Sequence, residues 1–145
     1  MTNSNDPHNL QRFVEAQDPV IEDVKSELRS GRKRTHWIWF VFPQMEGLGS
    51  SKMSRRFAIS SREEAKAYLD HPVLGPRLLE CTGIVNAVEG RSANDIFGSP
   101  DDLKFRSSMT LFDAVADDPT PFRMALEKYY GNEPDQKTLE LLDGP

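Results

Sequence analysis

Two acidic residues with apolar neighbours are the best candidates for acid–base chemistry in this sequence. Glu15 lies within the string RFVEAQ, and Asp95 lies within SANDIFGSP. Burial beside apolar side chains raises the pKa of a carboxyl group toward the range used in general acid–base catalysis. If the protein is an enzyme, we therefore predict Glu15 and Asp95 as its catalytic residues. Asp95 also has the position of a turn or helix-capping residue, and that alternative stays open at this point.

Anion binding is the second chemistry that the residues indicate, because the cations are concentrated between Arg29 and Arg56. This segment holds seven of the 18 lysine and arginine residues but one of the 23 acids, Glu46, so its net charge is +6 and that of the remaining chain is −11. A local basic surface on an acidic protein attracts one anionic ligand, such as phosphate, without general adhesion to nucleic acid. The alternative is a solvated basic face that pairs with the acidic remainder.

The same segment contains both tryptophans, in the run HWIWFVF (residues 36–42). Six successive bulky apolar residues show no helical periodicity and are of strand-favouring types, so we predict an extended segment. An extended chain places Trp37 and Trp39 on one side and Ile38, Phe40 and Phe42 on the other. Tryptophan can stack on a ring and donate its indole N–H, which suits a pocket wall. Burial of both sides is the alternative, which we favour for Ile38, Phe40 and Phe42.

A glycine-rich turn follows, in which Gly47 and Gly49 precede Ser50, Ser51 and Lys52. Glycines allow backbone N–H groups to face an anion, and the start of a short helix is expected here. The P-loop spacing is missing, and an ordinary glycine turn is the alternative. The ligand-binding residues predicted from the whole segment are Arg32, Lys33, His36, Trp37, Trp39, Gln44 and Lys52.

Metal and thiol chemistry have little support. The three histidines, His8, His36 and His71, are far apart and show no metal-binding spacing, so we predict no metal site and no cofactor. Cys81 is the only cysteine, which excludes an internal disulfide. It lies on an apolar helical stripe, and we expect it to be buried rather than reactive.

Helical signals cover most of the remaining chain. We expect Asp18 to cap a helix that ends at Gly31 and Ser99 to cap another. A helix between them is expected to start at one of two capping-box pairs, Ser60 with Glu63 or Ser61 with Glu64. Further helices are expected after Pro72, after Pro119 up to Gly131, and from Asp135. The sequence therefore predicts a mainly α-helical, compact single-domain bundle spanning residues 1–145, with one extended aromatic segment at about residues 36–42.

The ends and the composition place the protein in a broad class. The polar start MTNSNDPHN has no signal-peptide pattern, and we expect residues 1–7 to be flexible. No apolar run approaches the roughly 20 residues that cross a bilayer. With a single cysteine, these features predict a cytoplasmic protein without a membrane partner.

Four strings together resemble the bacterial family called domain of unknown function 1810, some members of which carry a calpastatin label. They are LQRFVEAQ, GRKRTHWIWFVFPQMEGLG, HPVLGPRLLECT and DIFGSPDDLKFRSSMTLF, and they extend over nearly the whole chain. The resemblance implies a single, mainly α-helical domain and no established activity. Nothing in this chain implies calpain inhibition.

A more distant similarity suggests a reaction. The order AKAYLDHPVLGPRLLECTG and then VEGRSANDIFG is similar to the later part of the NADAR N-glycosidases, with Glu89 and Asp95 at the positions of two family acids and Phe97 replacing a tryptophan. NADAR proteins remove ADP-ribose or phosphoribosyl-linked bases, which implies hydrolysis through an oxocarbenium-like state. The family's N-terminal S-x-E-H region has no counterpart here, where FVEAQ offers only Glu15 and Gln17.

Two hypotheses of different classes follow. In the first, the protein binds a phosphorylated ribose or nucleotide: Arg32, Lys33 and Lys52 anchor phosphate, and Trp37 or Trp39 stacks on the base. As an enzyme it would then be an N-glycosidase-like hydrolase that uses Glu15 or Asp95. In the second, it is a non-enzymatic adaptor whose basic and aromatic surface holds a protein or, less favoured, a nucleic acid. The sequence leaves the oligomeric state open.

Overall fold

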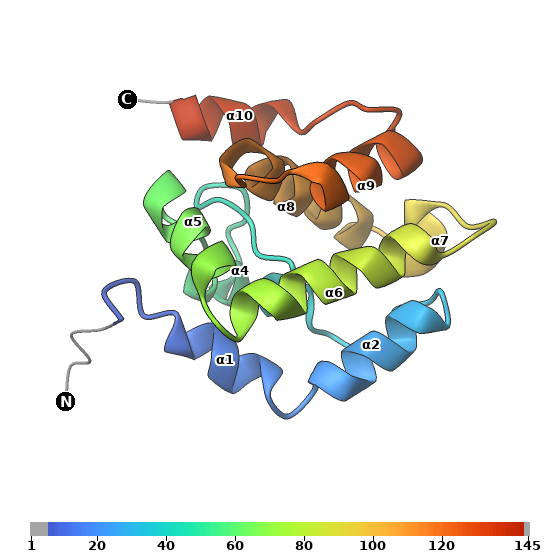
Figure 1. Ribbon diagram of the computed structural model, residues 1–145, viewed down its shortest axis with the longest axis horizontal. Coiled ribbons are helices and arrows are strands. Elements are labelled where there is room, and N and C mark those ends of the chain that lie inside the picture. Colours follow the sequence, from blue (N-terminus) through green and yellow to red (C-terminus); the bar gives the residue numbers. More distant parts are fainter. Residues whose placement is uncertain (1–5, 144–145) are drawn as a thin grey trace.

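The periodic segments of the sequence form ten α-helices among residues 6–143, which are the residues that this computed structural model describes (Figure 1). The helices are α1 (Gln11–Gln17), α2 (Ile21–Arg29), α3 (Ile38–Val41), α4 (Lys52–Arg56), α5 (Arg62–Asp70), α6 (Leu74–Ala87), α7 (Ala93–Phe97), α8 (Asp101–Val115), α9 (Thr120–Tyr130) and α10 (Gln136–Asp143).

Several helix ends follow the predicted capping chemistry. The Ser61 hydroxyl accepts from the backbone N–H of Glu64 at 3.1 Å and starts α5. The Asp135 carboxylate accepts from the N–H of Thr138 at 3.1 Å and starts α10. Gly131 ends α9 in the left-handed conformation, with φ of 61°. The two side chains and the backbone N–H of Gly131 satisfy N–H and C=O groups that a helix leaves unpaired at its ends.

Two predicted helix starts are wrong. Asp18 lies at the C-terminal end of α1, where its carboxylate pairs with the guanidinium of Arg77 at 2.9 Å, and α2 begins at Ile21 without a side-chain cap. Ser99 likewise does not cap α8, whose first residue is Asp101. The Asp18 carboxylate is engaged by a charged partner on α6, a charge-assisted hydrogen bond, instead of the N–H groups of α2.

The two longest helices, α6 and α8, organise the domain. Helix α6 packs against α2, α5 and α9, and α8 contacts α3, α5, α7, α9 and α10. Figure 1 shows α6 crossing the front of the molecule, with α1 and α2 on one side and α8 to α10 on the other. The short helix α3 packs against both α1 and α8 and so lies inside the bundle. The predicted mainly α-helical class is confirmed.

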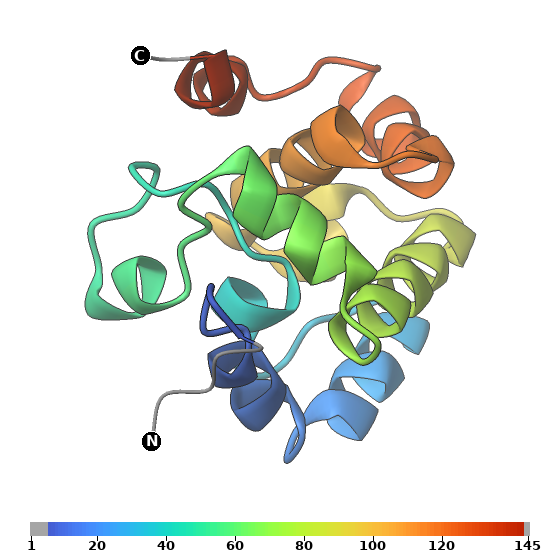
Figure 2. The ribbon, with the colours of Figure 1, turned by 60° about the vertical axis from the view of Figure 1, so that its left-hand side comes forward.

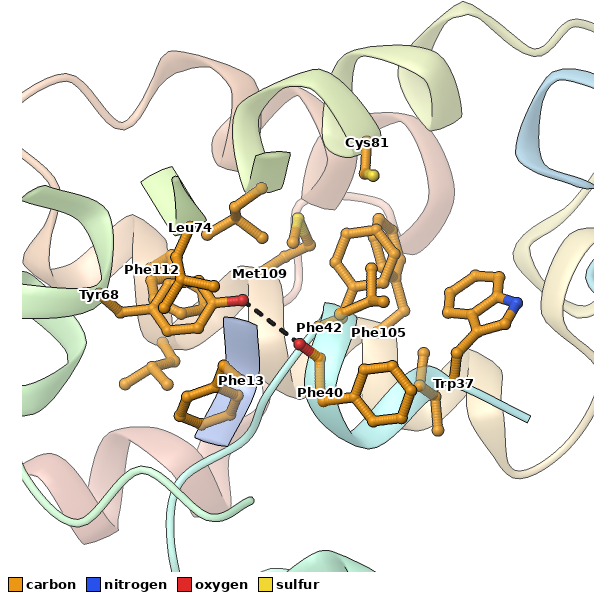
Figure 3. Packing of buried hydrophobic residues seen from close by; sticks show 14 of the residues in the cluster. Phe13, Trp37, Phe40, Phe42, Tyr68, Leu74, Cys81, Phe105, Met109 and Phe112 are labelled. Carbon is orange, nitrogen blue, oxygen red and sulfur yellow. Dashed lines mark hydrogen bonds between the residues drawn. The ribbon is translucent and has the colours of Figure 1, made fainter. Parts of the chain in front are cut away.

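Aromatic rings fill the centre of this bundle (Figure 3). Phe42 packs edge-on against Phe105, with ring centroids 4.9 Å apart, and Phe13 packs edge-on against Tyr68 at 5.1 Å. The Tyr68 hydroxyl lies beside the amide of Gln17, and both groups donate to the carbonyl of Phe40. Burial raises the pKa of the Tyr68 phenol far above its ordinary value.

The prediction of an extended segment at residues 36–42 is wrong, because residues 38–41 form the single helical turn α3. A strand inside the bundle would need a partner strand for its N–H and C=O groups. The turn instead bonds the N–H of Val41 to the carbonyl of Trp37 at 3.2 Å and the N–H of Phe42 to that of Ile38 at 3.0 Å. It buries Ile38, Phe40 and Val41 together and leaves Trp39 half-buried on the other side.

The predicted flexible start, residues 1–7, lies only partly within the residues that the structure describes. Residues 1–5 of the expected flexible start lie outside the described range. Within it, the Asp6 carboxylate accepts from the N–H groups of Leu10 at 2.7 Å and Gln11 at 3.0 Å and so caps α1. From Asp6 to Asp143, no helix has both the length and the apolar composition to cross a bilayer.

Candidate functional site

Residues 44–59 form a loop, here called the 44–59 loop, that is closed at its base and exposed at its tip (Figure 2). At the base, the N–H of Glu46 donates to the carbonyl of Ile59 at 2.8 Å, and the N–H of Ile59 donates to the carbonyl of Gln44 at 2.8 Å. Helix α4 lies within the loop and contains no buried residue. The base of the loop is therefore anchored in the core, while Leu48 and Met53 of the tip pack against the core and stay only partly buried.

The tip is held by a close approach between Gly49 and α4. A Cβ atom added to Gly49 would lie 2.5 Å from the Ser54 hydroxyl oxygen and 2.6 Å from the Ser54 Cβ, so the loop closes in this form only with glycine at this position. The Ser51 hydroxyl accepts from the N–H of Ser54 at 3.0 Å and starts α4. The predicted start of a short helix after the glycines is confirmed.

A small cavity of about 20 Å³ lies under this loop. It is lined by Trp39, Gln44, Met45, Glu46, Gly47, Gly49, Ser54, Arg55, Phe57 and Ala58. The volume is enough for about one water molecule. The indole Nε1–H of Trp39 is buried and has no hydrogen-bond partner among the described residues. A buried donor left without an acceptor costs about 1–3 kcal/mol, so an acceptor, either a water molecule or a ligand atom, is expected at this N–H.

The charges around the cavity come from three elements. Arg55 and Glu46 both line it, which makes the charge of the lining itself neutral. Lys104 of α8 places its ammonium group 5.3 Å from the centre of the Trp39 ring, a cation–π contact. Lys52 lies exposed one turn before Arg55 on α4. Neither Lys52 nor Arg55 forms an ion pair with any described residue, so both are available to an anion.

Two residues predicted to bind a ligand, Trp37 and Lys33, have side chains that are buried in the fold and do not line the cavity. Trp37 is 1% exposed, and its indole Nε1–H donates to the Glu27 carboxylate at 3.0 Å. The Lys33 ammonium pairs with Asp101 at 2.9 Å and donates to the carbonyl of Thr35. Neither side chain presents a surface to a ligand, and we correct both assignments.

Glu27 of α2 holds residues 34–37 of the basic segment through hydrogen bonds. Its carboxylate accepts from the backbone N–H groups of Arg34 at 2.7 Å and Thr35 at 3.0 Å, from the Thr35 hydroxyl at 2.6 Å, and from Trp37. Burial alone would raise the pKa of Glu27, but these hydrogen bonds outweigh it and lower the pKa to about 2. The carboxylate is thus ionised and fixes residues 34–37 onto α2.

Of the other predicted ligand residues, Trp39 and Gln44 lie together at the cavity and the remaining three do not line it. Arg32, His36 and Lys52 are exposed. Arg32 and Lys52, like Arg34, Arg55 and Arg56, form no ion pair with a described residue, whereas Arg29 pairs with Glu80 at 3.8 Å. The basic segment is therefore divided between ion pairs that belong to the fold and cations that remain open to solvent.

The structure does not bring the two predicted catalytic acids together at the cavity. Glu15 is exposed on α1, and Asp95 is exposed on α7. Asp95 and Ser92 form a reciprocal capping box, and the hydrogen bonds from Ser92 lower the pKa of Asp95. The expected burial and raised pKa of Asp95 are therefore wrong, and its alternative role as a capping residue is confirmed.

Cys81 is buried as expected, and burial raises the pKa of its thiol to about 12.

Sequence reasoning missed Glu46, Ser54, Arg55 and Lys104 as neighbours of Trp39. Arg55 belongs to the basic segment, and its position on the helix after the glycine turn was the available signal. Lys104 reaches Trp39 from α8 and had no local signal.

A wider hollow of about 460 Å³ lies between α1 and α5 and is lined in part by Asp6, His8, Asp70 and His71. Its Asp6 carboxylate caps α1, and the Nδ1 atom of His71 accepts from the N–H groups at the start of α6. Across residues 6–143, no three His, Cys, Asp or Glu side chains are grouped so as to hold a metal ion. No residue that lines this hollow has a buried polar side-chain atom without a partner, in contrast to Trp39 at the cavity under the 44–59 loop.

Comparisons with known proteins agree with the fold. The sequence pattern of a family described as protein of unknown function (DUF1810) matches residues 7–142. The crystal structure of the conserved hypothetical protein Rv1873 from Mycobacterium tuberculosis superposes with a TM-score of 0.95 at 58% identity, covering 97% of this chain and 100% of that one. No curated protein matches the chain significantly.

Proposed function

Because the chain belongs to the DUF1810 family, whose description assigns no function, we propose a function from the site itself: binding of a small phosphorylated ligand under the 44–59 loop. The ligand class is a ribose phosphate or a nucleotide. The observation that carries the proposal is the buried indole N–H of Trp39, which has no acceptor among the described residues, in a residue that lines a cavity.

The polar groups near Trp39 suit an oxyanion. Arg55 presents a guanidinium group, which binds phosphate oxygens in a bidentate manner, and Gln44 adds an amide. Lys52 on the same short helix and Lys104 against the indole ring add positive charge. Together these cations outnumber the one carboxylate of the lining, Glu46. A dianionic phosphate monoester matches this balance better than a neutral sugar.

The size of the cavity requires the loop to move. About 20 Å³ holds a water molecule but no sugar or base, so the present form is closed. Opening would displace Gly49 and α4, which contains no buried residue, while the base pairing of Glu46 with Ile59 stays in place. Segments with few buried contacts are those that open locally at low cost.

The proposal concerns binding rather than a reaction. Hydrolysis of an N-glycosidic bond, which the similarity to NADAR N-glycosidases implies, remains a hypothesis. Neither Glu15 nor Asp95 lines the cavity, where the carboxylate present is that of Glu46. An assay of base release is therefore a second step, which follows only from demonstrated binding.

Thermal unfolding in the presence of ribose 5-phosphate, ADP-ribose, AMP, unphosphorylated ribose and a short oligonucleotide tests the proposal. A ligand at about a hundred times its Kd adds roughly 2.7 kcal/mol to the free energy of unfolding. We expect stabilisation by at least one phosphorylated ligand and none by ribose. Trp39→Phe and Arg55→Ala should lose this effect, whereas Arg34→Ala, which removes an exposed cation away from the cavity lining, should keep it.

If the ligand still stabilises both Trp39→Phe and Arg55→Ala, it binds somewhere other than this cavity. Stabilisation by the oligonucleotide alone, with a steep dependence on salt, would favour the adaptor hypothesis.

A further inference from the structure

Lys104 is joined to a second lysine through one carboxylate. Oδ2 of Asp101 lies 2.9 Å from the Lys33 ammonium, and Oδ1 of the same residue lies 3.8 Å from the Lys104 ammonium. One negative charge thus faces two positive charges, and the group of Lys33, Asp101 and Lys104 carries a net charge of +1. Because Lys33 is the nearer partner and its side chain is 6% exposed, the uncompensated charge belongs mainly to Lys104.

Each of these lysines also lies over a tryptophan ring. The Lys33 ammonium is 5.0 Å from the centre of the Trp37 ring, and the Lys104 ammonium is 5.3 Å from that of Trp39. The first contact is internal, since Trp37 belongs to the core. The second contact involves Trp39, which lines the cavity, while Lys104 itself is not part of the lining. The side chain of Lys104 is 23% exposed, so its charge is only partly screened by solvent.

We propose that Lys104 determines the preference of the Trp39 site for anions, an inference that rests on the proposed binding function. Without Lys104, the charges of the lining, Arg55 and Glu46, cancel. A ligand oxygen bonded to the Trp39 indole N–H would lie within about 10 Å of the Lys104 ammonium, inside the range of an incompletely screened charge. A cation against an indole ring also withdraws electron density from it and makes its N–H a stronger donor to an anion.

Asp101 acts in this arrangement as a positioning residue. It holds Lys104 from the first turn of α8, three residues away on the same helix face. Shared between two lysines, it restrains the ammonium without neutralising it. An unshared carboxylate would cancel the charge that the site needs.

Isothermal titration of ribose 5-phosphate into the wild-type protein, Lys104→Met and Lys66→Met tests this inference. Lys66 of α5 is the control because it is also a lysine paired with an aspartate, Asp117 in the loop between α8 and α9. We expect Lys104→Met to weaken binding about five- to tenfold, and Lys66→Met to leave it unchanged. Lys104→Arg should restore most of the affinity, and the dependence of Kd on KCl concentration should be smaller in Lys104→Met than in wild type.

The outcomes separate this inference from the proposed function. If the wild type does not bind ribose 5-phosphate or another phosphorylated ligand, both are overturned. If the wild type binds and Lys104→Met, shown by urea unfolding to be folded, binds equally well with the same salt dependence, the role of Lys104 is overturned and the proposed function stands.

Discussion

The indole Nε1–H of Trp37 donates to the carboxylate of Glu27 across 3.0 Å, whereas the indole Nε1–H of Trp39, two residues later, has no partner among the described residues. The turn α3 separates the two rings by pointing Trp37 into the core and leaving Trp39 half-buried. One short aromatic run therefore supplies both a structural tryptophan and the candidate ligand donor.

Glu27→Gln should lower the free energy of unfolding by about 2–4 kcal/mol, because an amide cannot accept all the hydrogen bonds that the buried carboxylate receives from residues 34–37. Urea unfolding at pH 7 measures the change. Glu22→Gln on the same helix removes a carboxylate whose side chain is 82% exposed and should change the stability by less than about 0.5 kcal/mol. Equal effects of the two substitutions would contradict the role of Glu27.

The contribution of Glu27 should also depend on pH. Its pKa is about 2 in the folded protein, against 4.5 as the ordinary value. Since the folded pKa is depressed, the stabilisation is fully present above about pH 4.5 and is lost as the pH falls toward 2. The shift corresponds to about 3 kcal/mol. The stability difference between wild type and Glu27→Gln should therefore shrink over this range, and a difference that does not change with pH would contradict the pKa.

Arg12→Lys should destabilise the protein by about 2 kcal/mol or more, although it keeps the charge. All three guanidinium nitrogens of Arg12 donate: to the carbonyls of His8, Asn9, Arg56 and Ala58 and to the Glu64 carboxylate at 2.8 Å. Lysine has three N–H donors on a single atom and cannot reach these acceptors together. Arg62→Lys, at a half-exposed ion pair, is the control and should cost less than about 1 kcal/mol.

Gly49→Ala should open the tip of the 44–59 loop, because the new Cβ would meet Ser54 at 2.5 Å. We expect faster hydrogen exchange of the amides of α4, with the Glu46 and Ile59 amides at the base still protected. The double variant Gly49→Ala with Ser54→Gly removes the clashing atoms and should restore slow exchange. Gly83→Ala, at a position with nothing within 4 Å, should leave the loop unchanged. Unaltered exchange in Gly49→Ala would show that the loop is not closed by this contact.

Local signals in the sequence predicted much of the fold. Ser61, Gly131 and Asp135 act where their capping chemistry indicates, since caps depend on residues three or four positions away. The conformation of residues 36–42 could not be predicted in this way. It is decided by the bundle that surrounds it, including the donors from Gln17 and Tyr68 that meet the carbonyl of Phe40.

The candidate site, like the fold, could be predicted only where local signals exist. Trp39 and Gln44 stand out in the sequence because a large ring and an amide follow a run of cations. The roles of Glu27 and Lys104 depend on contacts between distant segments, which residue spacing does not reveal. The two acids in apolar strings, Glu15 and Asp95, face solvent because the apolar neighbours of each lie on the opposite side of its helix.

The most direct test of the central claim is the pair of indole N–H resonances in a ¹⁵N-labelled sample titrated with ribose 5-phosphate. The protein has two tryptophans, and Trp39→Phe identifies which resonance is which. We predict a saturable shift of the Trp39 resonance, while that of Trp37, already bonded to Glu27, stays in place. A Trp39 resonance that does not move at saturating ligand would contradict binding at this site.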